Sequence, residues 1–131
     1  LPARTILFPD TLEILGYLKE KGYKMHLITN GFEKTQYSKL KHSGLKPFFR
    51  EIITSESSGS IKPQKEIFYY AMNKAGADVY ESIMIGDSIE VDIMGAMNVG
   101  MDQVHVNYNN TDQEITPTYT VKHLKELKEF L

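Results

Sequence analysis

Short apolar segments with strand character alternate with segments of helical periodicity along this chain of 131 residues. Strands are predicted over residues 24–28, 51–54, 83–85 and 103–106, with a short edge strand over residues 119–121. Helices are predicted between Asp10 and Gly22, over residues 33–43 and 65–75, around Asp92 with an end at residues 98–100, and over residues 122–131. Residues 55–60 are predicted to form a polar loop. Because strands that alternate with helices form βαβ units, the pattern predicts an α/β fold with a mainly parallel sheet.

Length and composition are those of one globular domain over residues 1–131, in which residues 1–9 are linker-like. The formal net charge of −2 provides no basic face, so we expect no nucleic acid partner. The absence of cysteine excludes disulfides and thiolate chemistry. No apolar run approaches the roughly 18 residues of a membrane span. No signal peptide is visible, so we expect a cytoplasmic protein without a membrane partner.

The first candidate site follows the apolar residues 83–85, where Gly86, Asp87 and Ser88 come directly after the predicted strand. Ligands of parallel α/β sheets bind beyond the carboxyl ends of the strands, and a carboxylate there suits Mg²⁺, which prefers oxygen ligands. Asp92 can lean toward the same edge, because helical side chains tilt toward the helix N-terminus. The structural alternative is that Asp87 or Ser88 caps the helix and Asp92 stabilises its dipole.

Polar residues also follow the two preceding strands of the predicted sheet. Thr29, Asn30 and Gly31 end the first strand, and Lys62 comes after the second. A hydroxyl and the free N–H groups of Asn30 and Gly31 can bind a phosphate, and a lysine ammonium can neutralise its charge. Because the carboxyl ends of parallel strands meet at one edge, we expect these residues to lie near Asp87 and to form a phosphoryl-transfer site.

Each part of this constellation also has an ordinary structural interpretation. Residues 29–31 could form a simple turn, Lys62 and Pro63 could begin a helix with Pro63 near its first position, and Asp92 could be an exposed helical residue. For each group of residues taken alone, the structural interpretation is stronger than the functional one. That all three groups occur by chance in this order is far less expected, so the combination favours the functional interpretation.

These residues resemble the motifs of the haloacid dehalogenase (HAD) superfamily of phosphohydrolases. Residues 28–31 look like its second motif, residues 62–63 like its third, and residues 86–88 together with Asp92 like its fourth. The resemblance covers nearly the whole chain. Residues 7–31 look most like the branch that includes nucleoside 5′-monophosphatases.

The resemblance implies a three-layer, Rossmann-like core and a Mg²⁺-dependent phosphatase that acts on a small-molecule phosphomonoester. Thr29 would bind the phosphoryl group together with Asn30 and Gly31. Lys62 would steady both the nucleophile and the phosphate. Asp87 would be a Mg²⁺ ligand, and Asp92 would bind the metal indirectly or brace Lys62. The implied catalytic residues are therefore Lys62, Asp87 and Asp92.

One departure from the family is serious, because its first motif, D-x-D-x-T/V, is absent from the sequence. In the family its first Asp is the nucleophile and its second the general acid/base. Asp10 is no substitute, since it lacks a second Asp and begins a helix. The helical cap domain between the first two motifs is also absent. We therefore expect the C-terminal portion of a HAD core, which is inactive alone, with a nucleophilic Asp outside this chain that forms a phospho-aspartyl intermediate.

Two rival hypotheses remain. A receiver-type signalling domain also uses acidic residues, a Thr and a Lys-Pro, but there the acidic residues come first, whereas the order here is Thr29, Lys62, Asp87. A non-catalytic HAD-like module would keep the phosphate or metal site and lack the nucleophile. The substrate cannot be named without the cap domain.

The resemblance also implies that the missing first-motif strand is central, between the strands at residues 24–28 and 83–85. Without it both neighbours expose unpaired backbone groups, which are costly when buried and recruit partners. We expect one of three arrangements: the segment lies outside this sequence, another chain donates a strand by strand exchange or homo-oligomer formation, or the two neighbours pair directly. Residues 4–8 are the only local candidate to fill the gap, and their short link to the first helix argues against them.

Overall fold

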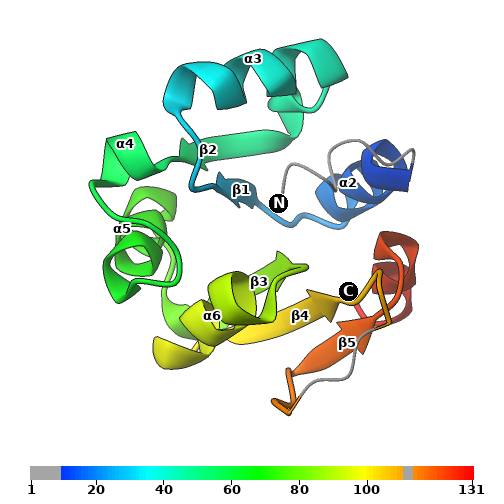
Figure 1. Cartoon of the computed structure of the whole chain (residues 1–131). Helices are drawn as coiled ribbons and strands as arrows, with labels where there is room; N and C mark the ends of the chain where they lie inside the picture. The colour runs from blue at the N-terminus through cyan, green and yellow to red at the C-terminus, as the bar shows by residue number, and fades with distance from the viewer. Residues whose placement is uncertain (1–9, 111–113) are drawn as a thin grey trace.

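The computed structural model describes residues 10–110 and 114–131 (Figure 1). The helices and strands in chain order are α2 (Asp10–Glu20), β1 (Met25–Ile28), α3 (Glu33–Ser43), β2 (Phe49–Ile53), α4 (Ser55–Ser58), α5 (Lys65–Ala75), β3 (Ile83–Gly86), α6 (Met94–Asn98), β4 (Asp102–Val106) and β5 (Tyr119–Val121). Short 3-10 helices are η1 (Lys46–Phe48), η2 (Val79–Glu81) and η4 (Leu124–Glu129), and η3 (Ile89–Ile93) is a π-helical turn. The alternation of strands and helices agrees with the predicted α/β class.

The strands form two parallel groups, β1 with β2 and β3 with β4 and β5. Within the described residues, β1 pairs only with β2, and β3 pairs only with β4. Figure 1 shows β1 and β3 as the strands of the two groups that face each other. Of the three arrangements expected from the sequence, direct pairing of these two strands is therefore not the one found. Residues 4–8, the local candidate for the gap, lie outside the described residues.

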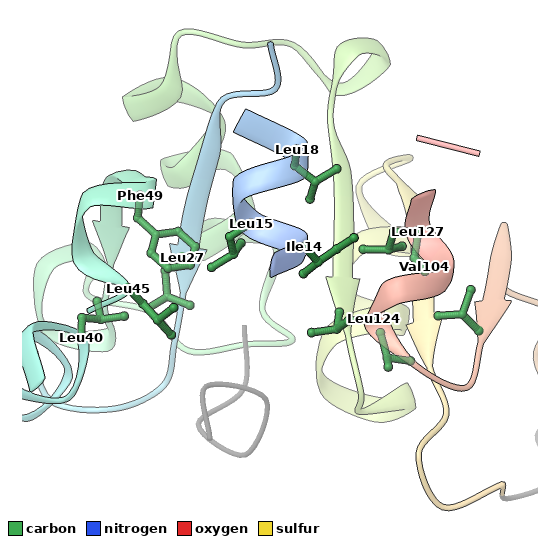
Figure 2. Packing of buried hydrophobic residues seen from close by; sticks show 12 residues of the cluster. Ile14, Leu15, Leu18, Leu27, Leu40, Leu45, Phe49, Val104, Leu124 and Leu127 are labelled. Carbon is green, nitrogen blue, oxygen red and sulfur yellow. The ribbon is translucent and has the colours of Figure 1, made fainter. Parts of the chain in front are cut away.

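The two strand groups share a hydrophobic core on each face. On one face α2 contributes Ile14 and Leu15, which pack in a cluster with Leu27 of β1, Val104 of β4 and Leu127 of η4. Figure 2 shows the α2 side chains between Leu27 on one side and Val104 with Leu127 on the other. Because this cluster draws on both groups, α2 holds them together without hydrogen bonds between β1 and β3.

The opposite face is covered by α5 and α6. Ile67 and Phe68 of α5 are fully buried and pack against Ile28 of β1, Met84 of β3 and Ala96 of α6. Strand side chains alternate between faces, which is why Leu27 belongs to one cluster and Ile28 to the other. Helices on both faces of parallel strands give the three-layer arrangement expected from the sequence.

Glycines end α3 and α5 where the sequence predicts these helices to stop. Gly44 and Gly76 have φ values of 76° and 67°, the left-handed conformation that only glycine adopts without strain. Their backbone N–H groups donate to carbonyls of the preceding turn. These caps fix where the chain leaves each helix for the next strand.

Two segments differ from the sequence-based expectation. Residues 55–60 do not form only a loop, because Thr54 and Ser57 make a reciprocal capping box that starts the one-turn helix α4. The last helix is the 3-10 segment η4 rather than a helix over residues 122–131. Its start is fixed by Glu126, whose Oε2 accepts hydrogen bonds from the N–H groups of Lys122 and His123 at 2.7 Å.

None of the helices among residues 10–110 and 114–131 combines the length and the apolar character that crossing a bilayer requires.

Candidate phosphoryl-transfer site

The loop after β1 carries the predicted phosphate-binding residues. The N–H of Gly31 donates to Oγ1 of Thr29 at 3.1 Å, because a short side chain can reach the backbone two residues on. The expectation that the Gly31 N–H is free for phosphate is therefore wrong in this structure. Ser55 of α4 supports the same loop from outside, with its hydroxyl 3.2 Å from the carbonyl oxygen of Asn30 and 3.3 Å from that of Gly31.

Asn30 links this loop to the segment that carries Lys62. Its Oδ1 accepts a hydrogen bond from the Lys62 N–H at 2.8 Å, and its Nδ2 donates to the Lys62 carbonyl at 3.2 Å. A side-chain amide can bind a backbone N–H and C=O of one residue in this way, which fixes both position and direction. The sequence predicted Asn30 for its backbone N–H and gave no sign of this role, because its partner lies 32 residues further along.

Lys62 and Asp92 form a buried ion pair at the centre of the site. Nζ of Lys62 lies 2.6 Å from Oδ1 of Asp92, and the two side chains are only 7% and 2% exposed. The other carboxylate oxygen of Asp92 accepts a hydrogen bond from the N–H of Ser88 at 3.3 Å. The pair therefore joins the Lys62 segment to the loop after β3. This is the geometry that bracing of Lys62 requires, while the role of Asp92 toward a metal stays a prediction.

The π-helical turn η3 carries Asp92 back toward the end of β3. The N–H groups of Asp92 and Ile93 both donate to the carbonyl of Ser88, at 3.0 and 3.1 Å. Gly86 leaves room for this approach, because a Cβ at that position would lie 2.6 Å from Cγ of Asp92. Glycine at the strand end is therefore required for the carboxylate to sit where it does.

Asp87 follows β3 directly, as the sequence predicts, and is half-buried. Among the residues that the structure describes, its carboxylate has no hydrogen-bond or ion-pair partner, whereas its backbone oxygen lies 3.2 Å from Nε2 of His105. Nothing in the sequence points to a role for His105, since a lone histidine in a strand has no pattern that marks it. Asp87 thus supplies the carboxylate that is available to a ligand.

The donors fit a Mg²⁺ site only in part. Asp87 offers carboxylate oxygens, while Oδ1 of Asp92 is already paired with Lys62. Within residues 10–110 and 114–131 no group of three or more metal-ligating side chains is present. Because Mg²⁺ keeps several waters and often takes only one or two carboxylates, Asp87 suits it as one ligand of a site that further donors complete.

The contacts bring the predicted residues to one edge of the strands. Hydrogen bonds run from the Asn30 loop to Lys62, the ion pair continues to Asp92, and Asp92 binds the backbone next to Asp87. Residues 62–63 also lead into a helix, as the structural alternative holds, with Pro63 two residues before the start of α5 at Lys65 and Gln64 as its N-cap. A hydroxyl, a fixed ammonium and an available carboxylate at one edge can bind a phosphoryl group and a cation together.

Comparison with known proteins places these residues in a family context. Residues 3–106 match the profile of the haloacid dehalogenase-like hydrolases. The chain is 36% identical over 126 residues to pyrimidine 5′-nucleotidase YjjG of Escherichia coli, covering 94% of this chain and 56% of that protein. It is 39% identical over 107 residues to glyceraldehyde 3-phosphate phosphatase of Methanothermobacter thermautotrophicus, covering 82% of this chain and 47% of that protein.

Solved structures agree with this match. A HAD phosphatase from Thermococcus onnurineus superposes with a TM-score of 0.89 at 36% identity, covering 93% of this chain and 56% of that chain. The putative HAD-hydrolase YfnB of Bacillus subtilis, described as bound to magnesium, superposes with a TM-score of 0.88 at 34% identity, covering 93% and 54%. The chain spans about half the length of the relatives it matches.

Proposed function

Because the chain belongs to the haloacid dehalogenase-like hydrolase family, we propose that the complete protein is a Mg²⁺-dependent phosphatase of small phosphomonoesters. Relatives named as a pyrimidine 5′-nucleotidase and a glyceraldehyde 3-phosphate phosphatase make nucleoside 5′-monophosphates and sugar phosphates the first substrates to test. The family match also favours the hydrolase over the receiver-type hypothesis.

The observation that carries this proposal is the buried ion pair of Lys62 with Asp92 beside Asp87. An ammonium held by a carboxylate and by the Asn30 contacts has a fixed position, which catalysis by charge stabilisation needs. The half-buried Asp87 precedes Ser88, whose N–H binds the Asp92 carboxylate that holds this ammonium. A carboxylate for the metal ion and an ammonium for the phosphate, placed side by side, are what a phosphate ester with a bound metal requires.

In the proposed reaction, the first Asp of a D-x-D motif outside this sequence attacks the phosphorus atom, and the ester oxygen leaves with a proton donated by the second Asp of that motif. Water then gives a proton back to the second Asp and attacks the phosphorus of the acyl phosphate, which releases inorganic phosphate and restores the first carboxylate. Lys62 holds its ammonium against the phosphoryl oxygens. The hydroxyl of Thr29 accepts from the Gly31 N–H and still has its own proton to donate to one of these oxygens. Asp87 would hold Mg²⁺, which when bound polarises the phosphoryl group.

Two findings support placing the nucleophile on another segment. The 131 residues contain no D-x-D pattern. In the described residues, β1 and β3 have no strand between them. A strand inserted there would satisfy both edges, and its carboxyl end would come close to Thr29 and Asp87 if it ran parallel to them. Exchange of such a strand between copies stays a prediction.

Phosphate release by the complete protein tests the proposed function, with nucleoside 5′-monophosphates and glyceraldehyde 3-phosphate as substrates, with and without Mg²⁺. We expect metal-dependent release that Asp87→Asn and Lys62→Met each lower by at least about 100-fold, because both charges act on the transition state. The 131-residue chain alone should show no enzyme-like turnover, since the covalent route lacks its nucleophile.

Matched controls are available on the same elements. Asp102 is exposed at the start of β4, the end opposite to the site, and Lys65 is exposed at the start of α5. Asp102→Asn and Lys65→Met should keep the rate of the unmodified protein. Equal losses in these controls would contradict the roles given to Asp87 and Lys62. No release from any substrate by a folded complete protein would favour the non-catalytic module instead.

A further inference from the structure

The buried histidine of β4 has no part in the chemistry proposed above. The His105 side chain is 2% exposed, and its Nε2 lies 3.2 Å from the backbone oxygen of Asp87. A carbonyl oxygen can only accept a hydrogen bond, so Nε2 must carry the proton and donate. His105 therefore holds the backbone of the residue proposed to bind the metal.

The register of the sheet brings the imidazole to this point. His105 pairs with Gly86 in the parallel ladder of β3 and β4, and residues paired in this way direct their side chains to the same face. That face also holds the Asp92 carboxylate, since a Cβ on Gly86 would meet it. The absent side chain of Gly86 thus leaves space in which both His105 and Asp92 reach the residues that follow β3.

The peptide group between Asp87 and Ser88 is consequently held at both of its polar atoms. Its carbonyl accepts from Nε2 of His105, and its N–H donates to Oδ2 of Asp92 at 3.3 Å. Fixing both atoms fixes the plane of the peptide group. Because Asp87 also directly follows β3, which holds the backbone before it, this limits the direction in which the Asp87 side chain leaves the backbone. Since Asp92 also pairs with Lys62, the same contacts relate the Asp87 carboxylate to the ammonium.

A simple packing role explains His105 less well. Its strand neighbours Val104 and Val106 belong to the hydrophobic cluster on the opposite face, because strand side chains alternate, so His105 is not part of that apolar packing. Nδ1 of His105 is buried and has no hydrogen-bond partner among the described residues. Burying a polar atom without a partner is unfavourable, so an apolar residue would suit packing better.

We propose that His105 is a positioning residue: it holds the Asp87–Ser88 peptide group and thereby directs the Asp87 carboxylate toward the metal. Of this proposal, only the claim that the Asp87 carboxylate binds a metal rests on the proposed function. The contact with the backbone can be tested without metal, so the two claims can fail separately.

The first test is amide hydrogen exchange of Ser88, followed by NMR on the complete protein without metal. His105→Leu removes the donor and keeps apolar bulk, whereas His105→Gln keeps an N–H donor. We expect exchange at Ser88 about tenfold faster in His105→Leu, the scale of one lost hydrogen bond, and partly restored in His105→Gln. The amide of Val104 should be unchanged. Unchanged exchange at Ser88 in His105→Leu would overturn the proposal.

The second test is a Mg²⁺ titration of the same proteins, followed through the NMR signals of Asp87. The Mg²⁺ concentration at half-saturation should rise about tenfold in His105→Leu, as is typical when a residue that orients a ligand is lost. His26→Leu is the control, because His26 lies in β1 and its Nδ1 likewise has no partner among the described residues.

A loosened Ser88 with an unchanged Mg²⁺ midpoint would overturn the positioning of the carboxylate. An absence of any Mg²⁺ response at Asp87 in the unmodified protein would refute the proposed metal site and the last step of this proposal. Faster Ser88 exchange in His105→Leu would in that case still support the contact with the backbone.

Discussion

The side chains of Lys62 and Asp92 meet almost without solvent contact, at 7% and 2% exposure. Taking two charges out of water costs several kcal/mol for each, so a buried pair of this kind is weak evidence for stability and better evidence for a fixed position. Both residues have further contacts, Lys62 through its backbone to Asn30 and Asp92 through Oδ2 to Ser88. The pair therefore holds one ammonium in one place.

For this pair of residues we predict that Asp92→Asn lowers the free energy of unfolding of the complete protein by about 3 kcal/mol, because it leaves a buried ammonium without its carboxylate. Urea denaturation measures the change. The double variant Lys62→Met with Asp92→Leu should regain most of the loss, since it removes both charges.

The control for this prediction is the other ion pair of the described residues, between Lys128 and Glu13 at 2.7 Å. Its side chains are open to solvent, at 37% and 64% exposure, and Lys128→Met should leave stability unchanged within error. An Asp92→Asn protein as stable as the unmodified one would contradict the account of the buried pair.

The elements that follow β3 determine where the carboxylates lie. The helix after Gly86 starts with the π-helical turn η3, and such turns recur at functional sites in proteins. Here the turn places Asp92 against the backbone of the strand end. The position of the ion pair therefore depends on a glycine and on one irregular turn.

The element-scale prediction concerns Gly86→Ala, whose methyl group would collide with the Asp92 carboxylate. Displacing Asp92 moves Lys62, and a misplacement of about 1 Å at such a site costs about 100-fold in rate. We expect kcat/KM for phosphate release to fall by about this factor. Gly16→Ala in α2, where a Cβ would meet nothing within 4 Å, should leave kcat/KM unchanged. Unaltered kcat/KM in Gly86→Ala would show that the close approach is not needed.

The sequence predicted the order and type of the strands well, because apolar runs and helical spacing are local signals. β1 and β4 begin within one residue of the predicted bounds, whereas β2 begins two residues earlier, at Phe49. The one-turn helix α4 was missed because its capping box uses Ser57 in place of the usual Glu or Gln. The turn η3 was missed because a single π turn leaves no periodic pattern.

The candidate site was predicted in its residues and not in its contacts. Thr29 and Asp87 could be placed because each directly follows a strand, and topology brings such positions to one edge. The contact of Asn30 with Lys62 and that of His105 with Asp87 join residues 32 and 18 positions apart. Nothing in one sequence relates such residues, so only the folded chain shows these contacts.

At the scale of the whole molecule, the described residues form two strand groups that are held together by helices on both faces. Their facing strands, β1 and β3, end directly before Thr29 and Asp87 and have no strand between them in the described part of the chain. Unpaired strand edges are sites at which a further strand can add. We therefore predict a site that is completed by a strand carrying the nucleophile.

The most direct test of this claim is acid-quenched mass spectrometry of the complete protein during turnover, followed by peptide mapping. We expect one phosphoryl group on an aspartate outside the 131 residues, formed only with substrate and metal and removed by water. A phosphoryl group on an aspartate within them, or metal-dependent turnover by the 131-residue chain alone that Asp87→Ala abolishes, would contradict this claim.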